Sequence, residues 1–149
     1  MVWYAGDNDN IVVRIDPRTG KMTPFPLPTP DSGPRRITAD ADGNLWTNTL
    51  AEGKLVKVDY RTGKMTEYTP PTAGAGQGVD VDTQRNRIWF GEYEAIKIGR
   101  FDPRANTFAE FSLLNADVQP WMIQVDPTNR NRVWWNSRIG RFGYMEVIE

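Results

Sequence analysis

The sequence repeats itself with a period of about 43 residues, which constrains the fold more than any other feature. The string RTGKMT occurs at Arg18 to Thr23 and again at Arg61 to Thr66. Four columns of single residues keep the same register: Trp3, Trp46, Trp89 and Trp134; Asp16, Asp59 and Asp102; Gly20, Gly63 and Asn106; and Phe25, Tyr68 and Phe111. Repeats of this length indicate a solenoid or a propeller.

Each repeat predicts four short antiparallel strands, which we call a to d in chain order. In the second repeat we expect strand a at 37–39, strand b at 45–47, strand c at 54–59 and strand d at 64–68, separated by turns rich in Asp, Asn and Gly. No window shows the 3.6-residue periodicity of an amphipathic helix. Thirteen glycines and eleven prolines also interrupt any such segment.

Four strands in about 40 to 45 residues are typical of one blade of a β-propeller. In strand c, Val56 and Val58 alternate with Leu55 and Lys57, so apolar residues occur on both faces of the strand. A sheet with two apolar faces is covered on both sides, as a middle blade is. We interpret the four repeated tryptophans as large side chains that fill the layers between blades.

The fold class predicted is therefore all-β, with about three and a half propeller blades in one partial domain over residues 1–149. The blade remnants are expected at 1–32, 33–75, 76–118 and 119–149. The first lacks strand a and the last lacks strand d, which leaves apolar faces open unless further chain or a partner protein completes the ring. From the strand count we expect Met1 to be a truncation and Glu149 to lie near a native end.

Composition excludes several functions. Cysteine and histidine are absent, which removes thiolate chemistry, cysteine metal sites and the residue most often used for proton transfer near pH 7. Eighteen basic and nineteen acidic residues give a net charge of −1. No basic patch suggests a nucleic-acid partner, and no apolar run reaches the roughly 18 residues of a membrane helix.

The segments IVVRIDPRTGKMTPFPLPTPDSGPRRITADADGNLWTN and RIWFGEYEAIKIGRFDPRANTFAEFSL resemble the repeats of virginiamycin B lyases (streptogramin lyases). That family's repeat runs roughly GPHGI, DGxLWFTE, IGRIDPxTG, EFPLP, and the resemblance covers essentially the whole chain. It implies a seven-bladed propeller of which this chain is the C-terminal half. The WD40 alternative shares the period but not its own marks, since neither GH nor WD occurs.

The resemblance also implies an activity. The family's lyases use Mg²⁺ to open a cyclic depsipeptide by elimination, with a catalytic histidine and glutamate near the channel mouth. Here the histidine column holds Arg35, Gln77 and Trp121, and the glutamate column holds Gly6, Thr49, Glu92 and Ser137. Glu92 alone matches, as a possible base or Mg²⁺ ligand, and the residues by themselves require no cofactor.

Strand order sorts the loops into two ends of the propeller. The d to a linkers and b to c turns emerge together at one end, which we call the loop face, and the a to b and c to d turns at the other. The loop face is the expected ligand or partner site, with eight candidate residues: Arg35, Arg36, Thr49, Gln77, Glu92, Glu94, Trp121 and Ser137. Trp121 is expected either to line a pocket there or to plug the channel.

Four other motifs favour structural interpretations. GDNDN (6–10) offers oxygen ligands but lacks the spacing of a calcium loop, so we interpret it as a turn. DADGN (40–44) and DVDTQRN (80–86) are interpreted as a to b turns with exposed acids. GAGQG (74–78) has no lysine and no following helix for a phosphate site, and is expected to be a flexible linker.

Three functions remain open at this point. The first is a non-catalytic propeller module that binds a ligand or docks a protein partner through the loop face or the open blade edges. The second is a metal-dependent lyase whose catalytic set is incomplete in this chain. The third is a structural subunit of a larger assembly. Because related propellers are generally exported from bacteria, the resemblance implies a periplasmic or secreted location. The charge balance and the lack of a long apolar run predict no nucleic-acid partner and no membrane insertion.

Overall fold

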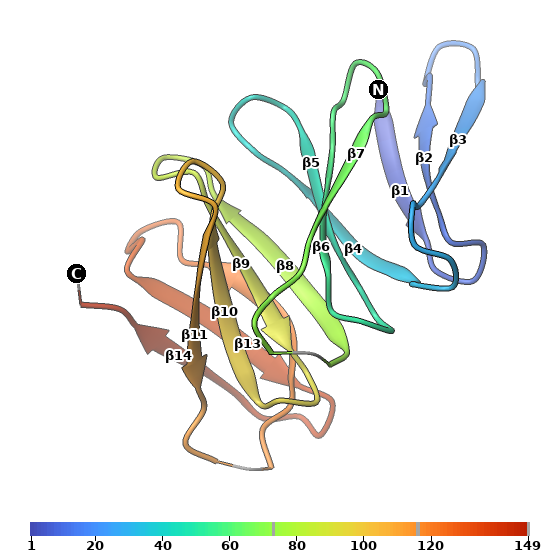
Figure 1. Ribbon diagram of the computed structural model, residues 1–149. Helices are drawn as coiled ribbons and strands as arrows, with labels where there is room; N and C mark the ends of the chain where they lie inside the picture. Colours follow the sequence, from blue (N-terminus) through green and yellow to red (C-terminus); the bar gives the residue numbers. More distant parts are fainter. Residues whose placement is uncertain (73, 116, 149) are drawn as a thin grey trace.

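A computed structural model describes residues 1–72, 74–115 and 117–148, and within these all regular structure is β strand. Fourteen strands form four antiparallel sheets that follow one another along the chain (Figure 1). The first is β1 (Val2–Gly6), β2 (Ile11–Ile15) and β3 (Met22–Pro26), and the second is β4 (Pro34–Ala39), β5 (Leu45–Thr49), β6 (Leu55–Val58) and β7 (Met65–Tyr68).

The third sheet is β8 (Gly76–Asp82), β9 (Arg87–Glu92), β10 (Lys97–Asp102) and β11 (Thr107–Ser112), and the fourth is β12 (Pro120–Val125), β13 (Arg132–Ser137) and β14 (Phe142–Glu146). Within each sheet the strands pair in sequence order. The predicted fold class is confirmed, because two complete four-stranded sheets lie between two three-stranded ones. No helix in the described residues is long and apolar enough to cross a membrane.

The repeated RTG segments are tight turns between strands c and d. Gly20 and Gly63 have φ of 71° and 76°, and Asn106 in the third copy has φ of 54°. This left-handed region is open to glycine and tolerated by asparagine. In each turn the aspartate, such as Asp59, accepts hydrogen bonds from backbone N–H groups two or three residues later. The repeated string is therefore a determinant of the fold.

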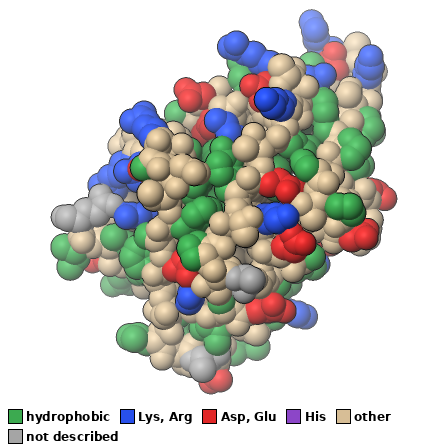
Figure 2. Space-filling model, viewed as in Figure 1, with side chains coloured by type: hydrophobic (Ala, Val, Ile, Leu, Met, Phe, Trp, Pro, Cys, Tyr) green, Lys and Arg blue, Asp and Glu red, His purple; other side chains and the backbone are tan. Residues whose placement is uncertain are grey.

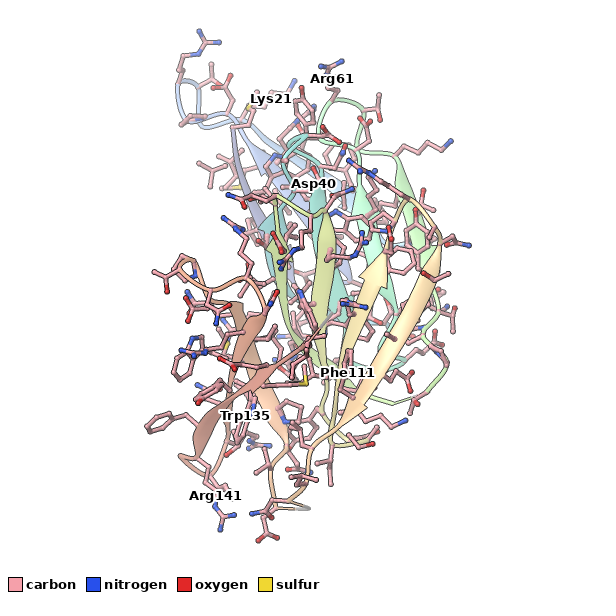
Figure 3. The ribbon with its side chains drawn as sticks, turned by 90° about the vertical axis from the view of Figure 1, so that its left-hand side faces the viewer. Lys21, Asp40, Arg61, Phe111, Trp135 and Arg141 are labelled. Atoms are coloured by element: carbon pink, nitrogen blue, oxygen red, sulfur yellow. The ribbon has the colours of Figure 1, made fainter. Side chains whose placement is uncertain are left out.

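The core consists of three apolar layers, one between each pair of neighbouring sheets. The middle layer joins Trp46, Leu55 and Tyr68 of the second sheet to Val79, Val81, Ile88, Phe90, Phe101 and Phe108 of the third. In the last layer, Phe111 of β11 and Trp135 of β13 lie between the third and fourth sheets (Figure 3). Three of the repeated tryptophans, Trp3, Trp46 and Trp89, belong to these layers, as their spacing predicts.

The two ends of the sheets carry different turns. Lys21 and Arg61, which follow or form c to d turns, lie at one end, and Arg141, from the turn before β14, lies at the other (Figure 3). Figure 1 shows the β5–β6, β7–β8, β9–β10, β11–β12 and β13–β14 connections gathered at the lower end of the view. These are the b to c turns and d to a linkers, so the loop face is assembled as the strand order requires.

Candidate functional site

A hollow of about 390 Å³ lies on the loop face and draws residues from three consecutive sheets. The innermost strands β4, β8 and β12 supply Arg35, Gln77 and Trp121. The b to c turns and the linker before β8 supply the remaining lining residues: Leu50, Ala51, Ala75, Tyr93, Glu94 and Arg138. Four of the eight predicted site residues therefore come together here, namely Arg35, Gln77, Glu94 and Trp121.

A break in strand register brings these side chains to the hollow. The pairing of each innermost strand shifts at its loop-face end: between Pro34 and Ile37 in β4, between Gly76 and Val79 in β8, and between Pro120 and Met122 in β12. Such bulges re-aim side chains and are frequent beside functional sites. Arg35, Gln77 and Trp121 lie within the three irregular segments, so the same local distortion is used three times.

Trp121 forms the aromatic part of the hollow. Its ring meets Tyr93 edge to face, with centroids 5.5 Å apart and an angle of 75° between the rings. The Arg138 guanidinium lies 5.1 Å from the Trp121 centroid, within the range of a cation–π interaction. The indole is held from two sides and is only partly buried, which leaves it accessible from the hollow. Trp121 thus lines the hollow on the loop face.

Arg35 contributes a positive charge that is incompletely satisfied. Its guanidinium forms an ion pair with Asp7 at 3.0 Å, and the Arg35 side chain is 34% exposed. Its Nε is nevertheless buried without a hydrogen-bond partner among the described residues. A buried donor of this kind costs free energy in the folded protein. Arg36, the next residue, is exposed on the strand and does not line the hollow.

Gln77 and Glu94 complete the polar lining. Gln77 is only 2% exposed although its side chain borders the hollow. Glu94 is exposed, and its Oε2 accepts a hydrogen bond from the backbone N–H of Ala75 at 3.2 Å. Figure 2 shows acidic and basic side chains interspersed over the face viewed there. The hollow likewise combines two arginines, one glutamate, one amide and two aromatic rings.

Three predicted residues lie at the ends of β5, β9 and β13 and do not line the hollow. The Oγ1 of Thr49 accepts a hydrogen bond from the backbone N–H of Lys54 at 3.0 Å, and the Oγ of Ser137 accepts one from Arg141 at 3.2 Å. Both hydroxyls therefore stabilise the b to c turns that follow their strands. Glu92 holds the equivalent position in the third sheet and behaves differently.

Glu92 is 4% exposed, and neither carboxylate oxygen has a hydrogen-bond partner among the described residues. Burial, followed by the negative charge of Glu110, raises the pKa of Glu92 to about 8, although the nearby Lys97 opposes this. Burial would also raise the pKa of Glu110, but hydrogen bonds from Thr72 and Lys97 prevail and lower the pKa of Glu110 to about 2. Glu92 is thus the protonated member of this pair at neutral pH.

The surroundings of Glu92 do not fit a Mg²⁺ ion. Hard cations require several oxygen donors, but Lys97 places an ammonium group in this cluster, 2.9 Å from Glu110 Oε2. The oxygens of Glu110 are already engaged by Thr72 and Lys97. Over residues 1–72, 74–115 and 117–148, no group of three or more Asp, Glu, Cys or His side chains could hold a metal.

The remaining motifs are structural. Residues 7–10 form the expected turn, in which Asn10 accepts hydrogen bonds from the backbone N–H groups of Ser32 and Gly33. Asp40 and Asp82 form the a to b turns as predicted, but the expectation that they are exposed is wrong, since they are 7% and 1% exposed. Asp80 is not a turn former as expected, because it lies within β8 and accepts a hydrogen bond from the backbone N–H of Val125. Asp40 accepts a hydrogen bond from Trp46 Nε1, and Asp82 pairs with Arg130. The expectation of a flexible linker at 74–78 is wrong for residues 76–78, which belong to β8 and are buried.

Three residues at or beside the hollow were not predicted from the sequence. Tyr93 and Arg138 each follow the glutamate-column residue by one position, and Asp7 follows Gly6 in the same way. The b to c turn starts at the residue that follows the glutamate column. The side chain of that residue therefore reaches the loop face when the glutamate-column residue points into the protein. These residues could have been found from the repeat, because they occupy the column directly after the glutamate column.

Comparison with known proteins agrees with this fold. A sequence model of the virginiamycin B lyase family matches residues 1–149. A crystal structure of virginiamycin B lyase from Staphylococcus aureus is 26% identical, with a TM-score of 0.81 over 97% of this chain and 51% of that one. No curated protein matches the chain in sequence.

Two further structures share the fold. A catalytically inactive variant of the Staphylococcus aureus enzyme, solved with quinupristin, is 22% identical with a TM-score of 0.79, covering 97% of this chain and 51% of that chain. The extracellular domain of a hybrid two-component system from Bacteroides thetaiotaomicron is 18% identical, with a TM-score of 0.70 over 97% of this chain and 19% of that one. The chain thus spans about half the length of the lyases it resembles.

Proposed function

The chain belongs to the virginiamycin B lyase family, and from this premise we propose that it acts as a non-catalytic propeller module that binds a ligand on its loop face. The observation that carries the proposal is the convergence of Arg35, Gln77 and Trp121, all within bulges of innermost strands, on one hollow of about 390 Å³. Ligand sites commonly combine an apolar concave surface with a few converging polar groups.

The chemistry of the hollow favours binding over catalysis. Its lining contains aromatic rings and arginines that can hold a large amide-rich or aromatic ligand, but its one carboxylate, Glu94, is exposed and bonded to backbone. The buried acid that has a pKa near neutral, Glu92, is outside the lining. Proton abstraction requires a base within hydrogen-bond reach of the substrate, and Glu92 lacks that access.

A binding experiment tests this function with quinupristin, the compound present in one related structure, as the probe. Calorimetric titration of the 149-residue protein is expected to show saturable binding that Trp121→Ala removes. Ile139→Ala is the matched control, because Ile139 is 62% exposed and does not line the hollow. Binding that Trp121→Ala leaves unchanged would refute the loop-face site.

A lyase is the second candidate, because Glu92 has a pKa suited to a general base near pH 8. Chromatographic separation of cyclic from ring-opened quinupristin, after incubation with the protein and Mg²⁺, distinguishes the two functions. We expect the cyclic compound to be recovered intact. Ring opening that is lost in Glu92→Gln would establish the enzyme instead.

The proposal extends to partner and location. Further propeller blades or a protein partner are expected to cover the outer faces of the first and last sheets, since exposed apolar faces promote association. We also propose an extracytoplasmic setting, either periplasmic or secreted. The extracellular domain from Bacteroides thetaiotaomicron among the structural relatives supports this location, and fractionation of the source cells would test it.

A further inference from the structure

The hollow on the loop face presents more hydrogen-bond donors than acceptors. Its lining includes two arginines, Arg35 and Arg138, and one acidic residue, Glu94. A guanidinium group carries five N–H donors, no acceptor and a permanent positive charge. The lining therefore has a surplus of donors and of positive charge, although the chain as a whole has a net charge of −1.

Arg35 uses only part of its guanidinium group within the protein. Asp7 Oδ2 lies 3.0 Å from Nη1 of Arg35, but Asp7 belongs to the turn after β1 and does not line the hollow. The Nε of Arg35 is buried and has no hydrogen-bond partner among the described residues. Buried donors in folded proteins are normally paired, so an exception needs an explanation. An acceptor supplied by a ligand in the hollow is one that the position of Arg35 allows.

Gln77 gives a second, independent indication of a missing partner. It is only 2% exposed and borders the same hollow, but its side-chain amide forms no hydrogen bond within the described part of the chain. An amide offers two donors and one acceptor, and burial without partners costs free energy. Because Arg35 and Gln77 lie in equivalent bulges of β4 and β8, both place unpaired donors at one site.

Aromatic surface borders the same space as these donors. Trp121 and Tyr93 both line the hollow, and their rings meet edge to face with centroids 5.5 Å apart. The guanidinium of Arg138 lies 5.1 Å from the Trp121 centroid, so a positive charge is held beside the indole. A ligand ring can pack against Trp121 while an anionic group accepts the hydrogen bonds that Arg35 and Gln77 leave unmade.

We propose that the hollow binds an aromatic carboxylic acid, with its ring against Trp121 and its carboxylate bonded by Arg35 and Gln77. A planar carboxylate accepts charge-assisted hydrogen bonds from a guanidinium group, and about 390 Å³ is within the range of small-molecule sites. This deepens the proposed function by naming the ligand class, and it rests on that function.

The charges of the lining disfavour the opposite class of ligand. A cation would meet two arginines, and the single acid, Glu94, is exposed and already accepts a hydrogen bond from Ala75. Glu94 also repels an anion, so it is expected to lower the affinity for a carboxylate without preventing binding. Arg35 and Glu94 therefore have opposite expected effects on the same ligand, which makes the proposal testable from two sides.

The test compares N-acetylphenylalanine with its amide, N-acetylphenylalaninamide, as probes. The two compounds share the ring and nearly the same shape, and only the first carries a negative charge. NMR titration of the 149-residue protein follows the indole N–H signal of Trp121, which is assigned by its absence in Trp121→Phe. We expect the acid to bind with a dissociation constant on the order of 1 mM, as is usual for so small a ligand. The amide should bind at least about tenfold more weakly, because it lacks the charge-assisted hydrogen bonds.

Two variants with matched controls identify the residues that set this preference. Arg35→Met is expected to bring the affinities for acid and amide close together, whereas Arg36→Met, outside the lining, keeps the preference. Glu94→Gln should tighten binding of the acid about two- to threefold and leave the amide unchanged, because it removes a like charge at an exposed position. Glu52→Gln is its control, since Glu52 is an exposed glutamate of the b to c turn in the second sheet and does not line the hollow.

Equal binding of acid and amide by the wild-type protein would overturn the proposal, and so would a preference that Arg35→Met leaves intact. The wild-type comparison needs no variant, and the dispersion of the remaining NMR signals shows whether each variant is folded. Quinupristin binding that depends on Trp121, without a preference for the acid, would refute this inference and leave the proposed function standing. Absence of binding by all three compounds would refute both.

Discussion

Glu92 and Thr49 occupy equivalent positions at the ends of β9 and β5, one repeat apart, but only Thr49 is hydrogen bonded. Thr49 Oγ1 accepts the N–H of Lys54, whereas both oxygens of Glu92 are buried without partners among the described residues. The neighbouring groups are otherwise duplicated. At the second sheet, Lys54 and Glu67 both form hydrogen bonds with Thr29, which lies in the linker before β4. At the third sheet, Lys97 and Glu110 bond Thr72, in the linker before β8, in the same way. Glu92 is thus an added acid in a repeated polar cluster.

Glu92 should make the protein less stable as pH rises. Its folded pKa is raised from 4.5 to about 8, so its favourable contribution is complete below about pH 4.5 and is lost as pH rises through 8. We expect Glu92→Gln to be about 1–3 kcal/mol more stable than wild type at pH 9, with little difference at pH 5. Thermal unfolding at several pH values measures this, and parallel curves for the two proteins would contradict it.

Glu110 should act in the opposite direction. Its pKa is lowered from 4.5 to about 2, so its contribution is present above about pH 4.5 and is lost as pH falls toward 2. Glu110→Gln is expected to destabilise by about 1–3 kcal/mol at pH 7 and much less at pH 2.5. Glu67→Gln, in the equivalent cluster of the second sheet, gives a matched comparison without a neighbouring buried acid. A loss in Glu110→Gln that is independent of pH would exclude the charged hydrogen bonds as its cause.

The two RTG glycines offer a matched pair for backbone strain. Both have positive φ, but a Cβ on Gly20 would meet open space, whereas a Cβ on Gly63 would overlap the ring of Phe25 from the preceding sheet. We expect Gly20→Ala to cost about 1 kcal/mol, from φ alone, and Gly63→Ala to cost at least about 2 kcal/mol more. Chemical denaturation gives both values. Equal losses would show that Phe25 moves aside freely.

The repeat made the fold predictable from the sequence, because its columns fix both strand order and turn chemistry. Strand b of the second sheet was expected at 45–47 and is Leu45–Thr49, and the repeated column of Gly20, Gly63 and Asn106 takes the left-handed conformation that these residue types favour. Such features depend on local propensity and on a period that is directly visible. The strand order also placed the d to a and b to c loops correctly at one end.

The candidate site was only partly predictable, because it depends on departures from the regular pattern. Alternation along a strand says which face a side chain takes, but a bulge resets that alternation. The bulges near Arg35, Gln77 and Trp121 carry no separate sequence signal. Similarly, a threonine and a serine at the ends of β5 and β13 look like loop-face candidates, and only the structure shows Thr49 and Ser137 bonded to their own turns.

Arg35 provides the last prediction, since it separates a binding role from a structural one. Its buried Nε has no partner among the described residues, and its ion pair with Asp7 joins two partly exposed groups, so the side chain is expected to contribute little stability. Arg35→Met keeps the apolar stem and should change the free energy of unfolding by less than about 0.5 kcal/mol. The same substitution should weaken quinupristin binding at least about tenfold, because a charged hydrogen bond to a ligand is worth more than 1 kcal/mol. Arg36→Met, at an exposed position outside the lining, is the control for both measurements. A large loss of stability with unchanged binding would instead assign Arg35 to the fold.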